Sequence, residues 1–209
     1  MIRTAFLKDL DYPTALKVQL DAVTGIETGD TEIVYGIEHA PCITLGRRSR
    51  GLSEELKDTQ IPIYSIQRGG LATYHGPGQL TVYPIIKIDR YGLGVRRWVE
   101  LLESVTISLL LRYGVQAQTK EGYPGVWTVN GKIASIGLQI KNGISMHGLS
   151  LNTKAQFEGF HLINPCGIEN INLSSLESEI GRIIPATLLF EELTFDLKNT
   201  LSNLTTTPN

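Results

Sequence analysis

The chain has 209 residues, of which 42% are hydrophobic and 19% charged, and its formal net charge is -2 at pH 7. This composition is typical of a folded globular protein and excludes an intrinsically disordered chain. So small a net charge also excludes attraction to nucleic acid or anionic membranes through the overall charge of the molecule. Basic clusters at residues 47–50 and 96–97 are interpreted first as solvated surface and second as contacts for an acidic partner.

Charged residues interrupt every apolar run near the N-terminus, so we predict no signal peptide, and no stretch is long enough to span a bilayer. The two cysteines, Cys42 and Cys166, are too few for a disulfide framework. We expect both to be free thiols in the reducing cytoplasm. Because the sequence contains no repeat, low-complexity tract or linker, we predict a single domain over residues 1–209.

In the first half of the chain, apolar periodicity predicts a helix and then a series of strands. The helix is expected at residues 12–27, and strands are expected at 32–38, 42–45, 61–66 and 80–88. A polar, glycine-rich insertion at residues 67–79 separates the last two strands.

The second half begins with the strongest helical pattern, at residues 95–111. Strands are predicted at 126–129, 132–140 and 143–151, then a loop at 152–175 and a closing helix at 185–201. Asn142-Gly143 is a typical two-residue hairpin turn between two of these strands. The pattern favours an α/β (α+β) fold in which helices flank a mixed β-sheet.

The densest unusual segment is the glycine-rich run at residues 68–79, RGGLATYHGPGQ. Its glycines allow backbone N–H groups to approach a ligand closely, and Arg68 and His75 add polar side chains at either end. The run is equally compatible with a simple turn between strands that holds a hydrogen-bonded histidine. It is neither a Walker phosphate loop nor a dinucleotide-binding motif.

Cys166 lies between a proline and a glycine, a context that can present a thiol at the edge of a cavity. It would need a nearby cation or helix N-terminus to ionise at neutral pH. A cysteine in a loop is, however, more often structural. Cys42 lies inside an apolar run and is interpreted as core filling.

Lys132 opens an alternating strand pattern, and its default interpretation is a lysine that snorkels at a sheet edge. If buried, it could serve as a base or stabilise a thiolate. His147 and His161 are further candidate bases. The histidines and cysteines lack metal-ligand spacing, so we predict no metal site.

Together these segments resemble the octanoyltransferases of lipoate biosynthesis. The resemblance covers residues 68–84, 125–140, 147–152 and 164–168, and it is specific because RGG-x-x-TYHGPGQ, KIASIG and PCG occur in the family's order. Leu149 and Ser150 stand where phenylalanine and alanine are common in the family. This departure would alter the shape of the pocket and leave the chemistry unchanged.

The resemblance implies the catalytic-domain fold of lipoate and biotin protein ligases. It implies that Cys166 is a nucleophile carrying the acyl group as a thioester and that Lys132 tunes this thiol and shuttles protons. The residues that it places around the acyl group are Arg68, Gly69, Gly70, Leu71, Ala72, Thr73, Tyr74, His75, Ser135, Ile136, Gly137, Gly148, Leu149 and Ser150.

The implied donor is octanoyl-acyl carrier protein. The implied acceptors are the lipoyl domains of 2-oxoacid dehydrogenases and the glycine cleavage H protein. No cofactor is implied, because exchange between thioesters and aminolysis to an amide need no ATP, and a monomer is expected.

Three alternatives remain open from the sequence. One is an ATP-dependent lipoate or biotin ligase of the same fold, and another is an amidotransferase acting between lipoyl domains. The third is a non-catalytic acyl-binding module.

Overall fold

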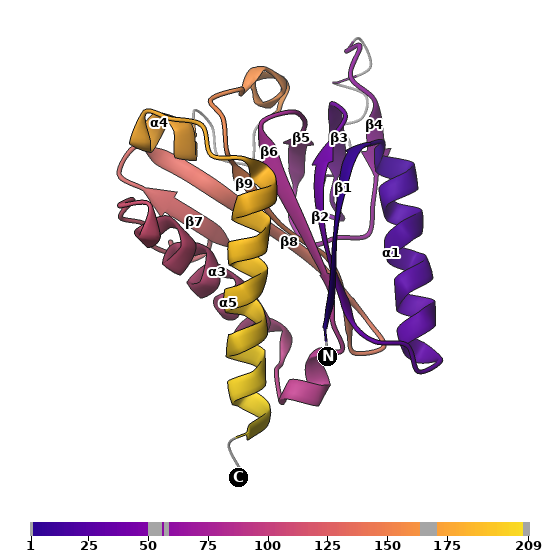
Figure 1. The fold of residues 1–209 in the computed structure, drawn as a ribbon. Helices are drawn as coiled ribbons and strands as arrows, with labels where there is room; N and C mark the ends of the chain where they lie inside the picture. Colours follow the sequence, from indigo (N-terminus) through magenta and orange to yellow (C-terminus); the bar gives the residue numbers. More distant parts are fainter. Residues whose placement is uncertain (1, 50–55, 57–58, 164–170, 207–209) are drawn as a thin grey trace.

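The computed structural model describes residues 2–49, 56, 59–163 and 171–206. Its main element is a six-stranded sheet with the strand order β1-β2-β6-β9-β8-β7 (Figure 1). These strands are β1 Arg3–Leu10, β2 Ile33–His39, β6 Gln79–Ile85, β9 Ile144–Asn152, β8 Gly131–Lys141 and β7 Gly125–Thr128. Strand β1 pairs parallel with β2, whereas the other neighbours pair antiparallel. The mixed sheet predicted from the sequence is therefore confirmed.

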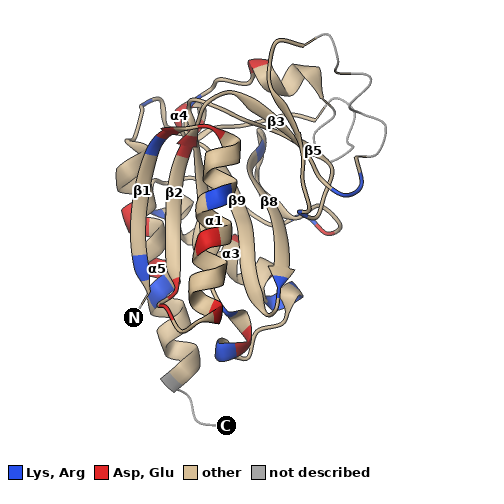
Figure 2. Ribbon diagram, turned by 90° about the vertical axis from the view of Figure 1, so that its right-hand side faces the viewer, with Lys and Arg blue, Asp and Glu red and all other residues tan. Residues whose placement is uncertain are grey.

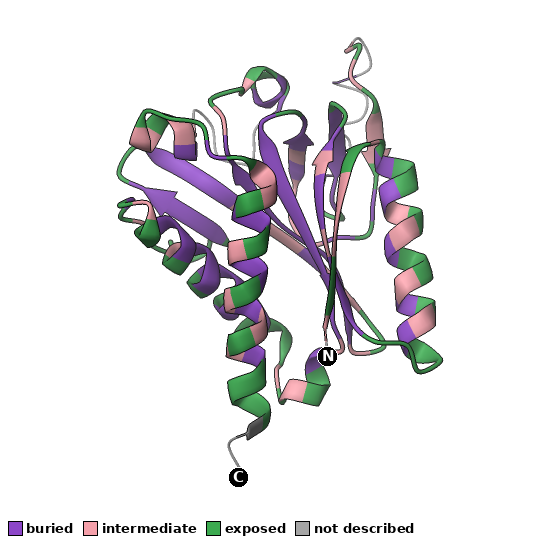
Figure 3. Ribbon diagram, in the orientation of Figure 1, coloured by how far each residue is buried: buried purple, intermediate pink, exposed green. Residues whose placement is uncertain are grey.

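Helices cover both faces of this sheet, as predicted (Figure 1). Helices α3 (Val95–Arg112) and α5 (Ala186–Thr206) pack on one face, and α1 (Tyr12–Glu27) packs on the other. The buried sides of the helices face the strands, and their exposed sides face outward (Figure 3). Trp98 of α3 is fully buried and donates a hydrogen bond from Nε1 to Ser145 Oγ at 2.9 Å, which satisfies its one polar group.

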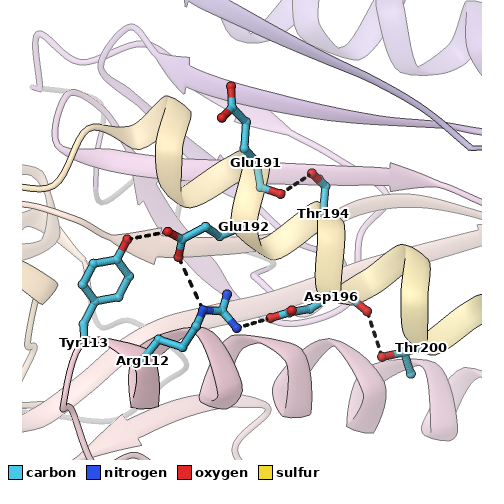
Figure 4. Close-up of polar contacts among 7 residues, drawn as sticks. All are labelled: Arg112, Tyr113, Glu191, Glu192, Thr194, Asp196 and Thr200. Carbon is cyan, nitrogen blue, oxygen red and sulfur yellow. Dashed lines mark hydrogen bonds and ion pairs between the residues drawn. The ribbon is translucent and has the colours of Figure 1, made fainter.

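A polar cluster joins α3 to α5 at their solvent-facing edge (Figure 4). Arg112 at the end of α3 contacts Asp196 at 2.6 Å and Glu192 at 3.5 Å, and Tyr113 Oη donates to Glu192 at 3.1 Å. Since Arg112 is 42% exposed, each ion pair contributes at most about 1 kcal/mol. The apolar faces of the two helices therefore supply most of the stabilisation between them.

A second, three-stranded sheet has the order β4-β3-β5. Its strands are β4 Ile63–Ser65, β3 Cys42–Leu45 and β5 Ala72–His75. It packs on the short 3-10 helix η2 (Glu158–Leu162) through a cluster that includes Ile43, Tyr74 and Phe160. The remaining elements of the described residues are η1 (Ile88–Tyr91) and α4 (Leu176–Ile180).

Charged residues lie mainly on the outer helices, the loops and the strand ends (Figure 2). The arginines at 47–48 and 96–97 are exposed, as both of their interpretations require, and Arg50 lies outside the described residues. Within the part of the chain that the structure describes, no helix combines the length and apolarity needed to cross a membrane.

Most elements lie where the sequence predicted them. The first helix has the predicted bounds, and Asn142 (φ 51°) and Gly143 (φ 75°) form the predicted hairpin turn between β8 and β9. Strand β1 was not predicted, because its charges obscure the alternation of an edge strand. Strand β5 was also missed, because it lies inside the run of glycines that suggested a loop.

Candidate active site

A pocket lies where β5 of the small sheet meets β6, β8 and β9 of the large one. Its wall combines apolar side chains with a few polar groups, a lining that is typical of small-molecule sites. The fold therefore brings the glycine-rich segment at residues 68–75 together with two strands of the large sheet that are distant in sequence.

All the residues expected around the acyl group, except Gly69 and Tyr74, line this pocket. Gly69 instead donates its backbone N–H to Leu138 O at 2.8 Å, which attaches the glycine-rich segment to β8. The ring of Tyr74 packs edge-on against Phe160, with centroids 5.5 Å apart. That the lining residues bind an acyl chain stays a prediction.

Four lining residues were not among those expected there. They are Tyr12, Thr81, Tyr83 and His147. The sequence offered a signal only for His147, as a candidate base, because the other three lie in elements whose apolar pattern predicts core positions. These three residues reach the pocket through contacts between segments that are distant in the sequence.

Arg68 is buried and acts as a clamp on the pocket wall. Its guanidinium donates to Gly69 O and to both the carbonyl and the hydroxyl oxygens of Thr44, each at 2.9 Å. A side chain at Gly137 would begin only 3.0 Å from Arg68 Cδ, so the glycine makes room for the arginine. Arg68 thus joins the glycine-rich segment to the small sheet.

Three buried histidines cluster with two tyrosines, and His75 and His147 among them line the pocket. His39 Nε2 contacts Tyr83 Oη at 2.9 Å, and His147 Nδ1 contacts Tyr12 Oη at 3.4 Å. Burial lowers the pKa of His39 and of His147 to about 4 and that of His75 to about 3. At neutral pH all three are uncharged, so they offer hydrogen bonds rather than positive charge.

His75 combines both interpretations of the glycine-rich run. It ends strand β5, is buried, and hydrogen-bonds through Nδ1 to Gln79 Oε1 at 2.7 Å, as a structural histidine would. It also lines the pocket. The segment is therefore both a connection between strands and part of the pocket wall.

Lys132 is only 1% exposed, so the interpretation that it snorkels at a sheet edge is wrong. Its Nζ donates to Pro124 O at 2.9 Å and lies 5.2 Å from the centroid of the Trp127 ring. Gly125 has φ +130°, and a side chain there would begin 2.7 Å from Lys132 Cε. The start of β7 therefore forms a close cradle around the buried end of the lysine side chain.

The chain segment that follows Cys166 in the sequence packs against Lys132. The backbone N–H of Lys132 donates to Asn172 O at 2.9 Å, and Ser174 N–H donates to Lys132 O at 3.0 Å. Glu179 holds this segment to the β7–β8 turn by accepting hydrogen bonds from Ser174 and from Thr128 Oγ1. The backbone beside the lysine is thereby fixed.

Of the two cysteines, the structure describes Cys42. Cys166, the expected nucleophile, lies outside the described residues. Cys42 is 2% exposed, and burial raises the pKa of its thiol to about 12, which confirms its interpretation as core filling. His161, a candidate base, lies exposed on η2.

Comparisons with known proteins agree with the fold and with the order of the motifs. Residues 11–196 match the family described as the lipoyl protein ligase A/B catalytic domain. An octanoyltransferase of Geobacter metallireducens is 37% identical over 180 residues, which cover 86% of this chain and 84% of that protein. One of Pseudomonas savastanoi is 39% identical over 174 residues, which cover 83% and 79% of the two chains.

Solved structures share the fold at low sequence identity. The LipL1 protein of P. falciparum in complex with lipoate has a TM-score of 0.75 at 10% identity, and it covers all of this chain and 65% of that one. A bipartite lipoate protein ligase of Thermoplasma acidophilum, described with its E2 lipoyl domain, has a TM-score of 0.71 at 13% identity and covers 97% and 85%. The chain belongs to the lipoyl protein ligase A/B catalytic domain family and, within it, to the octanoyltransferases, which are acyltransferases.

Proposed function

We propose that this protein transfers an octanoyl or lipoyl group from acyl carrier protein to the lysine of lipoyl domains through a thioester on Cys166. This is the first step of endogenous protein lipoylation, and the whole chain, residues 1–209, would act as one catalytic domain. The observation that carries the proposal is a buried Lys132 whose backbone is hydrogen-bonded to residues 172–174, a segment that follows Cys166 closely in the sequence. A charged Lys132 side chain close to Cys166 would favour ionisation of the Cys166 thiol.

The first half-reaction exchanges one thioester for another. The Cys166 thiolate attacks the carbonyl carbon of the donor, the new C–S bond forms, and the bond to the carrier's sulfur breaks. Lys132 gives a proton to the departing thiolate. Because one thioester replaces another, the step is roughly isoenergetic and needs no nucleotide.

The second half-reaction forms the amide. The acceptor lysine attacks the Cys166 thioester as a free amine, the C–N bond forms, and the C–S bond breaks. Lys132 takes the proton that the amine loses and returns one to the cysteine sulfur. Dividing the transfer into two steps through one thiol replaces a difficult reaction with two easier ones.

The pocket suits the acyl chain of such a substrate. Leu71, Ile136 and Leu149 contribute apolar side chains to its wall. Burial of six methylenes at ~0.8 kcal/mol each would stabilise a bound octanoyl group by about 5 kcal/mol and would discriminate against shorter chains. Backbone N–H groups of the glycine-rich segment would stabilise the tetrahedral oxyanion.

The proposed acceptors are the lipoyl domains of 2-oxoacid dehydrogenases and the glycine cleavage H protein. A related archaeal ligase has been described together with an E2 lipoyl domain, which supports acceptors of this class. The enzyme would act as a monomer in the cytoplasm, where reducing conditions keep Cys166 as a thiol.

Intact-mass spectrometry tests the proposal. Incubation with octanoyl-acyl carrier protein should add one octanoyl mass to the protein, Cys166→Ala should abolish the addition, and Cys42→Ala should retain it. Labelling that survives Cys166→Ala would refute the assignment. Transfer to a lipoyl domain that requires free octanoate and ATP would identify a ligase, and binding of the acyl donor without transfer would identify a binding module.

A further inference from the structure

A chain of hydrogen bonds between buried side chains connects the pocket to the backbone of Lys132. His75 Nδ1 contacts Gln79 Oε1 at 2.7 Å, and Gln79 Nε2 contacts Asn152 Oδ1 at 3.1 Å. Asn152 Nδ2 donates to Ser174 O at 3.0 Å and reaches Lys132 O at 3.5 Å. His75, Gln79 and Asn152 are each at most 7% exposed.

The fold places these three side chains in line. Residues 76–78 turn the chain from the small sheet into the large one, so His75 at the end of β5 lies close to Gln79 at the start of β6. Gln79 and Asn152 are directly paired residues of the antiparallel strands β6 and β9. Side chains at such paired positions lie on the same face of the sheet, within contact distance.

The backbone carbonyls at one end of the chain set the direction of every hydrogen bond in it. The carbonyl oxygens of Ser174 and Lys132 can only accept, so the Asn152 amide must present its NH₂ group to them and its oxygen to Gln79. Gln79 must then present its own NH₂ group to Asn152 and its oxygen to His75. A neutral imidazole that faces this oxygen must carry its proton on Nδ1, and its Nε2 is left as an acceptor.

We propose that Gln79 and Asn152 are positioning residues of the acyl-transfer reaction, which hold His75 in the Nδ1–H tautomer and present Nε2 as a hydrogen-bond acceptor to the pocket. The same chain joins this histidine to the backbone of Lys132 and to the segment that follows Cys166. The role in catalysis rests on the proposed function, whereas the tautomer does not.

The surroundings of His75 favour the neutral ring that this arrangement needs. Burial is the main cause of its low pKa, and His39, Arg68 and His147 lower the pKa further, whereas the hydrogen bond to Gln79 raises it. The rings of His39 and Tyr12 lie beside it, with centroids 5.6 Å and 6.5 Å away. A neutral ring has a single N–H, so the choice of tautomer decides whether Nε2 accepts or donates.

Nitrogen NMR of the ¹⁵N-histidine-labelled protein measures the tautomer directly. The chain has four histidines, so the resonances of His75 can be assigned by substituting the histidines one at a time. We expect the Nδ1–H form in the unmodified protein and a shift toward the Nε2–H form in Gln79→Leu. Gln118→Leu makes the same chemical change at an exposed position and should leave the tautomer unchanged.

The transfer rate tests the role in catalysis. Gln79→Leu should reduce kcat for octanoyl transfer by about 10- to 100-fold relative to Gln118→Leu, because it misorients a polar group that the pocket uses. Gln79→Glu keeps an acceptor toward Nδ1, so it should retain the tautomer and raise the pKa of His75 in an NMR titration. This variant also provides the test if Gln79→Leu does not fold.

Three results would overturn the inference. They are an Nε2–H tautomer in the unmodified protein, a tautomer that Gln79→Leu leaves unchanged, and a changed tautomer with transfer as fast as in Gln118→Leu. Since the NMR readout needs no acyl donor, it distinguishes failure of the hydrogen-bond chain from failure of the Cys166 mechanism.

Discussion

Three buried histidines should make the stability of this protein depend steeply on mildly acidic pH. Burial lowers the pKa of His39 and of His147 from 6.5 to about 4 and that of His75 to about 3. In the unfolded chain all three regain ordinary pKa values. Between about pH 6 and pH 5 the unfolded chain therefore binds protons that the folded protein does not bind.

The sign and the size of the effect follow from this difference. Because the unfolded state binds more protons, the free energy of unfolding falls as the pH falls below about 6.5. Each fully shifted group contributes ~1.4 kcal/mol per pH unit, so three contribute roughly 4 kcal/mol per pH unit. A small domain has a total stability of about 5–15 kcal/mol, so we expect unfolding before pH 4 is reached.

Urea unfolding at pH 7, 6, 5.5 and 5, followed by the fluorescence of the buried Trp98 and Trp127, would measure this slope. His147→Asn should reduce the slope by about a third, since asparagine tolerates the left-handed φ of 56° at this position. His161→Asn, at an exposed residue, should leave the slope unchanged. A flat profile between pH 6 and pH 5 would refute the burial of neutral histidines.

Three further predictions concern the lysine cradle and the two thiols. Lys132→Met should slow acyl loading by orders of magnitude, which loading kinetics would measure. The free energy of unfolding, measured in urea, should stay level or rise, because methionine fills a similar volume without a polar group to bury. Gly125→Ala should lower the free energy of unfolding by about 1–3 kcal/mol and slow acyl loading. Gly29→Ala is the control, because Gly29 also has a positive φ (+110°) but has nothing within 4 Å of an added Cβ. It should share the backbone strain and load normally. In a Cys166→Ala background, iodoacetamide should alkylate Cys42 only after the protein is unfolded, and labelling of the folded protein would contradict its burial.

Local sequence patterns predicted the first helix and the hairpin between β8 and β9. The helix at residues 12–27 has a broad apolar face and Asp11 as its N-cap, whose side chain accepts a hydrogen bond from Thr14 N at 2.8 Å. The hairpin at Asn142 needs positive φ at two successive residues, and Asn-Gly is the usual pair that supplies it. Strand β1 escaped prediction because it is a half-exposed edge strand whose partner among the described strands, β2, begins more than twenty residues later.

Some pocket residues could be predicted from the sequence, because their residue types are typical of binding sites. Others could not, because they look like ordinary core residues. Glycines beside an arginine and a histidine indicated one wall of the pocket from sequence alone. Tyr12 and Tyr83 looked like core aromatics, and they are both buried and part of the pocket lining. No local pattern distinguishes the two roles, because strand pairing decides which buried ring borders a cavity.

Lys132 shows why sequence statistics gave the wrong default. Lysine at a strand end is usually exposed, because burying an ammonium group is costly unless polar partners surround it. Here the Pro124 carbonyl and the Trp127 ring supply such partners, and Gly125 leaves the space that they require. Stability alone does not explain this lysine, since an apolar residue of similar volume would often stabilise the fold at least as well. The local arrangement thus supports a chemical role for Lys132 independently of the resemblance between sequences.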